Sequence, residues 1–408
     1  ALRMYFAWME ELPFDYVSQP VQANPGDETN DDIRYTKYGN KPGRVRGVAP
    51  GTTYDFYTEL RNLRNSVSTA TYRMHYDYVT DFYPTKIDRD HIRPGTVVYD
   101  PSGHAAIVYK VEKDGRVRMM DAHPDNSLTR ITYDQKFSRS RPAHGAGFRN
   151  WRPDFNTRPT KELGGFSTVQ FNKSFELNGQ PVSYYDFVRG MLAGGNLKFE
   201  PVAELKSMMG EVCSNVHDRV IAVDLALKDG IQNKAHPERL PNNIYGTTGE
   251  WEEYSTPSRD ARLKVAFVEL RQEMQRFVEM FKGRSPRIDY VPKPSKYSGN
   301  CSSPTCFLAA SLLSAYEETV MSKACVFQYK RTDGAVKKLS YTDVVERLFK
   351  LSFDPYHCAE LRWGASGEEL KTCRDGEGKR EWYSAEQGLR NQTERTYDAV
   401  MNTDVRET

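Results

Sequence analysis

The sequence predicts an α+β protein in which a helix and an antiparallel sheet are followed by a largely helical, disulfide-stapled domain. Three observations support this fold class. Before residue 155, short apolar runs are bounded by turn residues, as in antiparallel strands. After residue 200, apolar residues recur every three or four positions, as on one face of a helix. All six cysteines lie in this second, helical part.

The chain of 408 residues is long enough to bury more than one core, so we expect two or three domains. Changes in composition predict five segments. They are an N-terminal anchor segment and loop (1–54), a core (55–155), a linker with a hairpin (156–200), a helical domain (201–375) and a polar tail (376–408).

The anchor segment opens with an aromatic cluster for which packing is the favoured interpretation, formed by Tyr5, Phe6, Trp8 and Phe14. It continues into a stretch rich in Pro, Gly, Asp and Asn, which predicts a long loop. The core then begins with a helix expected over 55–78.

A strand hairpin in the core brings two histidines together. His104 opens an apolar run that ends at the turn 113–115, and the returning strand, 116–121, ends just before His123. The two ends of a tight hairpin are neighbours, so both imidazoles are expected on one edge. Because histidine titrates near physiological pH, such a pair suits proton transfer or metal binding.

The run PGTVVY, followed by GHAAIVY and a strand ending in DAHP, resembles the core of the NlpC/P60 and CHAP group of papain-like cysteine peptidases and amidases. The resemblance covers roughly residues 55–153. It implies a papain-like fold for this part, with His104 as general base and His123 as the residue that orients it.

Such a site needs a nucleophile, usually a thiolate at a helix N-terminus. No cysteine precedes Cys213, and the upstream helix carries Ser66 where a nucleophile is expected. In relatives with a permuted order, the cysteine follows the histidines in a context such as Tyr-Cys-Ser-Glu-Leu. Cys358, in PYHCAELRWGA, is similar to that context, so Ser66, Cys213 and Cys358 are alternative nucleophiles.

The competing role of the cysteines is disulfide formation. Cys301 with Cys306, and Cys358 with Cys373, are close enough in sequence to be natural pairs, which leaves Cys213 with Cys325. This arrangement consumes every thiol. No Cys-x-x-Cys pair marks a structural zinc module, and we expect neither a metal nor another cofactor.

The second half is expected to be built from long amphipathic helices, over 201–229, 259–282 and 305–321. Asn178-Gly179 predicts a hairpin turn before them, and 326–341 predicts a second hairpin around Thr332-Asp333-Gly334. A further helix is expected over 342–351.

Composition excludes some partners and favours one compartment. The 57 basic and 55 acidic residues nearly balance, which argues against nucleic acid as a partner. No apolar run is long enough for a transmembrane segment, and the N-terminus lacks the pattern of a signal peptide. Paired cysteines indicate an oxidising compartment, so a periplasmic or extracellular location is expected.

Two hypotheses follow from the sequence. In the first, the chain is an exported papain-like hydrolase that cleaves peptide or amide bonds in a peptidoglycan-like substrate of the cell wall. In the second, it is a non-catalytic secreted binding or structural protein that retains the fold without its nucleophile. The state of the thiols and their distance from His104 discriminate between them.

Overall fold

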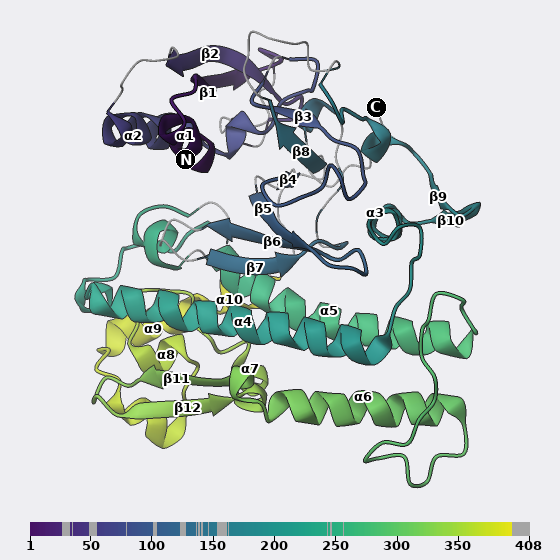
Figure 1. Ribbon diagram of the computed structural model, residues 1–408. Coiled ribbons are helices and arrows are strands. Elements are labelled where there is room, and N and C mark those ends of the chain that lie inside the picture. Colours follow the sequence, from purple (N-terminus) through teal and green to yellow (C-terminus); the bar gives the residue numbers. More distant parts are fainter. Residues whose placement is uncertain are drawn as a thin grey trace. The chain divides into compact units, whose positions relative to one another are not determined.

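The computed structural model describes residues 1–26, 33–34, 36–48, 55–78, 80–100, 104–122, 128–135, 137, 139, 142–145, 147–152, 161, 163–242, 244, 247–255 and 257–393 (Figure 1). The chain divides into two compact units. Of the described residues, the first contains 1–121 and 131–197, and the second contains 122, 128–130 and 198–393.

The N-terminal segment of the first unit is more regular than the sequence predicted. It comprises helix α1 (Leu2–Met9), strands β1 (Phe14–Gln22) and β2 (Asn40–Val48), and helix α2 (Phe56–Ser66). The expected long loop is therefore wrong in part, because β1 and β2 pair as an antiparallel ribbon. Pro20 and Pro42 face each other in it, which a two-stranded ribbon tolerates because each strand has only one partner to bond.

Helix α2 is shorter than the helix expected over 55–78. Asp55 caps its start by accepting a hydrogen bond from the backbone N–H of Thr58, and the helix ends at Ser66. Ser68 then caps a separate 3₁₀ turn, η1 (Thr69–Thr71). The run Val67-Ser68-Thr69 explains the break, because β-branched residues and serine favour extended or capping conformations over a helix interior.

The main sheet has the order β3-β8-β4-β5-β6-β7. Its strands are β3 (Phe82–Pro84), β4 (Val97–Asp100), β5 (His104–Val111), β6 (Val117–Ala122), β7 (Leu128–Thr132) and β8 (Gly147–Trp151). β5 and β6 pair antiparallel across the turn 112–116, which confirms the predicted hairpin.

Helix α3 (Tyr184–Leu192) packs on one face of this sheet and was not predicted. Phe187, Val188 and Leu192 join the sheet residues Val98, Ala106, Val108, Met119 and Phe148 in one buried cluster. The helix follows the hairpin of β9 (Phe175–Leu177) and β10 (Gln180–Val182), whose turn is the predicted Asn178-Gly179, with φ of 54° and 72°.

The second unit is built on three long helices, as the periodicity predicted. They are α4 (Pro201–Lys228), α5 (Pro257–Lys282) and α6 (Pro304–Val320), and they lie side by side (Figure 1). The predicted hairpin of β11 (Val326–Lys330) and β12 (Val336–Ser340) packs against α4 and leads into α7 (Tyr341–Arg347).

The chain then enters the most deeply buried segment of this unit. Every residue from 351 to 365 is buried, although the segment contains Asp354, His357, Glu360 and Arg362. It carries the short helix α8 (Ala359–Arg362) and is followed by η8 (Gly367–Thr372), α9 (Glu377–Ala385) and α10 (Gln387–Asn391). The remaining short helical turns are η2 (Pro142–His144), η4 (Val169–Phe171), η5 (Ile231–Asn233), η6 (Trp251–Ser255) and η7 (Lys323–Cys325).

Three disulfides staple the second unit. They join Cys213 to Cys325, Cys301 to Cys306 and Cys358 to Cys373, which confirms the pairing expected from the spacing. No helix in the described ranges is both long enough and apolar enough to cross a membrane.

Candidate functional site

The predicted general base, His104, is paired with a buried carboxylate. His104 begins β5 and Asp121 lies near the end of β6, and the Nε2 atom of the imidazole contacts the Oδ2 atom of Asp121. The side chain of Asp121 is 2% exposed and that of His104 is 28% exposed. A carboxylate in this position fixes the orientation of the ring, as in the Asp-His pairs of hydrolases. Proton transfer by this ring would use Nδ1.

Sequence reasoning gave the orienting role to His123 and overlooked Asp121. His123 lies outside the described residues. Asp121 follows Val117 and Met119 at two-residue spacing, and all three are buried. This alternation could have predicted the pair from the sequence. It places Asp121 on the buried face of the strand, and a buried carboxylate needs a polar partner.

Buried tyrosines lie within reach of the charge of Asp100, the strand neighbour of His104. Asp100 lies opposite His104 in the β4–β5 register, and its charge acts on the phenols of Tyr133 and Tyr185. Burial raises the pKa of Tyr133 well above its ordinary value and that of Tyr184 to about 12. The first turn of α3 therefore presents neutral phenols, which are poor nucleophiles.

The candidate nucleophiles do not meet the requirements of a thiol or serine hydrolase. Cys213 and Cys358 are both bonded in disulfides, and a disulfide sulfur has no thiolate with which to attack, so neither can be the nucleophile while these bonds are intact. The hydroxyl of Ser66 donates to the carbonyl oxygen of Asn62, 2.6 Å away, one turn back in α2. Within the described residues it makes no hydrogen bond to His104.

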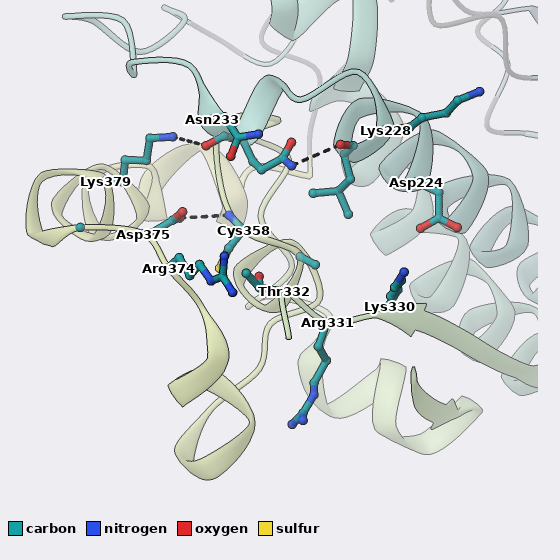
Figure 2. A pocket seen from close by; sticks show the side chains of 14 residues that line it. Asp224, Lys228, Asn233, Lys330, Arg331, Thr332, Cys358, Arg374, Asp375 and Lys379 are labelled. Carbon is teal, nitrogen blue, oxygen red and sulfur yellow. Dashed lines mark hydrogen bonds between the residues drawn. The ribbon is translucent and has the colours of Figure 1, made fainter. Parts of the chain in front are cut away.

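A second candidate site is a cavity of about 850 Å³ in the second unit (Figure 2). Three regions form its wall: the C-terminal part of α4 with η5, the end of β11, and the segment from α8 to the start of α9. The lining residues are Asp224, Leu227, Lys228, Gln232, Asn233, Lys330, Arg331, Thr332, Cys358, Ala359, Arg374, Asp375, Gly376 and Lys379.

The charge of this cavity is predominantly positive, since five basic and two acidic side chains line it. Lys228, Lys330 and Arg374 make no ion pair within the part of the chain that the structure describes, so their charges are available to a ligand. The ammonium of Lys379 instead donates to the carbonyl oxygens of Gln232 and Tyr356.

The two acidic residues offset only part of this positive charge, because five basic side chains line the cavity. Asp375 accepts a hydrogen bond from the backbone N–H of Cys358 at 3.0 Å and contacts Nδ1 of His357 at 3.2 Å, so its carboxylate is engaged within the wall (Figure 2). Burial raises the pKa of Asp224. The cavity therefore suits an anionic ligand. The sequence did not predict this cavity, because its basic residues come from segments far apart in the chain.

No family model matches this chain, and neither the curated proteins nor the solved structures contain a match.

Proposed function

We propose that this chain is an exported, non-catalytic binding protein whose second unit captures an anionic ligand. The observation that carries the proposal is the cavity lined by the unpaired cations Lys228, Lys330 and Arg374. The cavity brings these three like charges together around one hollow, and a cleft lined by charges of one sign attracts an ion of the opposite sign.

The ligand we propose is a short acidic peptide of the kind found in cell-wall material. A cavity of about 850 Å³ is large enough for several residues, and most of the residues that line it are polar. Arginine pairs with carboxylates through two parallel hydrogen bonds, and the neighbouring lysines add charge without fixing the orientation of a ligand. The resemblance of the first unit to the NlpC/P60 group agrees with a peptidoglycan-like partner.

The proposed location is the periplasm or the extracellular space. All six cysteines are paired, and disulfides persist in oxidising compartments whereas cytosolic thiols are kept reduced.

Calorimetric titration of the full chain with a carboxylate-rich tetrapeptide tests the binding role. We expect binding that weakens as salt rises and that is lost when the carboxylates are amidated. Replacing both Lys330 and Arg374 by alanine should weaken binding at least tenfold. The matched control replaces the exposed Lys293 and Lys338, which lie outside the cavity, and should bind as the wild type does. Equal affinities for the two double variants would refute the assignment.

A second candidate function is hydrolysis, which the His104–Asp121 pair favours. An amidase assay that detects new amino groups released from peptidoglycan peptides tests it. The binding proposal expects no turnover by the oxidised chain. Turnover that appears only after reduction and disappears on thiol alkylation would instead support a cysteine nucleophile. In either case, replacing His104 by alanine should abolish any activity, since the base would be lost.

A further inference from the structure

The second unit encloses a compact group of metal-binding side chains. Asp354, His357 and Glu386 each offer one ligand atom, and these atoms all lie within 4.8 Å of one another. All three residues are 0% exposed. Asp354 and His357 belong to the buried segment 351–365, whereas Glu386 lies between α9 and α10.

His357 is oriented as a metal ligand usually is. Its Nδ1 atom lies 3.2 Å from Oδ2 of Asp375, which fixes the ring and leaves Nε2 for the cluster. Nε2 is buried without a hydrogen-bond partner, and it lies 4.0 Å from Oδ2 of Asp354. A carboxylate behind the imidazole of a metal-binding histidine is the common arrangement that sets its tautomer.

Asp354 is also held in place from behind. Its Oδ1 atom accepts the backbone N–H of Tyr356 at 2.8 Å, and its Oδ2 atom lies 2.7 Å from Nε2 of His236. His236 is itself anchored through Nδ1, which lies 2.6 Å from the carbonyl oxygen of Pro237. His236 is therefore a positioning residue for the Asp354 carboxylate.

Glu386 is a buried carboxylate with few polar partners. Neither of its carboxylate oxygens has a hydrogen bond of normal geometry within the described residues. Nε of Arg390 lies 3.4 Å from Oε1, and the Ser352 hydroxyl also acts on the carboxylate. Burying a carboxylate without full compensation is costly, so this group calls for a proton or a cation.

We propose that Asp354, His357 and Glu386 bind a divalent transition-metal ion, with zinc as the best match. One imidazole nitrogen and two carboxylate oxygens are ligands that zinc accepts at about 2.0–2.2 Å. Bringing atoms that lie within 4.8 Å of one another to the edge length of a tetrahedral site, about 3.4 Å, needs shifts of about 1 Å or less per side chain. None of the three ligands lines the proposed anion cavity, although Asp375 lies in its wall and orients His357, and the metal proposal does not depend on the function of that cavity.

The bound ion would tie two parts of the second unit together. Ligands from segment 351–365 and from the α9–α10 junction would share it, so binding should stabilise the folded unit. The competing arrangement is a proton on Glu386, since burial, followed by the charge of Asp354, raises the pKa of this carboxyl well above its ordinary value. The two arrangements make opposite predictions for added metal.

The test is metal binding by the full-length, tag-free chain with its disulfides intact. Elemental analysis of the purified protein should find about one zinc per chain. After treatment with EDTA, calorimetric titration with zinc chloride should show one site, and zinc should raise the Tm. Cobalt(II) should give a visible absorption band typical of nitrogen and oxygen ligands. A thiol assay run alongside excludes zinc held by reduced cysteines.

Two substitutions of the same chemistry make the test specific. Glu386→Gln keeps the shape of the side chain and should weaken zinc binding at least tenfold, with no rise in Tm on adding zinc. Glu346→Gln changes an exposed glutamate of α7 outside the cluster and should behave as the wild type does. Circular dichroism of the metal-free Glu386→Gln variant checks that it folds. A wild-type chain that gains neither stoichiometric zinc nor stability, or a Glu386→Gln variant that binds zinc equally, would overturn the proposal.

Discussion

At the scale of single residues, Glu369 links three neighbouring elements of the second unit. It accepts two hydrogen bonds from the guanidinium of Arg347, at 2.7 and 2.9 Å, and a third from the phenol of Tyr329. Burial alone would raise the pKa of Glu369, but the bonds from Arg347 and Tyr329 outweigh it and lower the pKa to about 2.

The lowered pKa predicts an acid-sensitive contribution to stability. A carboxyl whose pKa is lower in the folded state stabilises the protein above its unfolded value, here 4.5, and this stabilisation is lost as pH falls toward 2. Glu369→Gln should therefore lower stability near neutral pH and flatten the loss of stability between about pH 5 and 2.5. Urea midpoints measured across this range provide the check.

The adjacent Glu368 is the matched control, because its side chain is 87% exposed and its ion pair is with Lys371. Glu368→Gln should keep the wild-type slope. Parallel stability curves for wild type and Glu369→Gln would show that Glu369 does not supply the acid dependence.

Some of the site residues could be predicted from the sequence alone, and others could not. It predicted the place of His104 on a strand end and the disulfide pairing, because both follow from local spacing. It did not indicate Asp121, because the two histidines of the hairpin suggested each other as partners, whereas Asp121 is marked only by its place on the buried face of the strand. It did not indicate the cluster of Asp354, His357 and Glu386, because the first two are three apart and Glu386 joins them only through the fold.

At the scale of elements, helix α3 docks on the turn of the β5–β6 hairpin through a close backbone approach. Gly115 in this turn has a φ of 83°, and a Cβ atom on it would lie 2.0 Å from the carbonyl oxygen of Arg189. Arg189 returns the contact, since its Nε donates to the carbonyl oxygen of Asp114 at 3.2 Å. Glycine is therefore required here for both its backbone angle and its lack of a side chain.

We predict that Gly115→Ala destabilises the first unit by about 3 kcal/mol or more, since strain at positive φ adds to a clash with backbone. Gly179→Ala isolates the first effect, because Gly179 has a φ of 72° and open space around it. It should cost only about 1 kcal/mol. Chemical denaturation of both variants gives the comparison. Equal losses would mean that α3 moves away from the turn at little cost.

The elements that the sequence predicted well are those that carry a strong period of their own. Helices α4, α5 and α6 repeat their apolar face over several turns, and turn residues punctuate the hairpins. Helix α3 was missed because its nine residues give only two turns of pattern. Strands β1 and β2 were missed because Pro and Gly in them signal a loop, although a two-stranded ribbon accepts both.

At the scale of the whole molecule, the disulfides divide the chain unequally. All three lie in the second unit, while the first unit contains no cysteine. Removing a disulfide lets the unfolded chain explore more conformations, and the effect grows with the length of the closed loop. The bond between Cys213 and Cys325 spans 112 residues, whereas the bond between Cys301 and Cys306 spans 5.

We therefore predict that replacing Cys213 and Cys325 by alanine destabilises the second unit by about 4–5 kcal/mol, against about 2 kcal/mol for the Cys301 and Cys306 pair. Differential scanning calorimetry of both double variants is the measurement. The first unit should unfold at an unchanged temperature in each, because no disulfide lies in it. Equal shifts for the two variants would show that native packing around the bonds, and not loop length, sets their contribution. A parallel shift of both units would show that they unfold together.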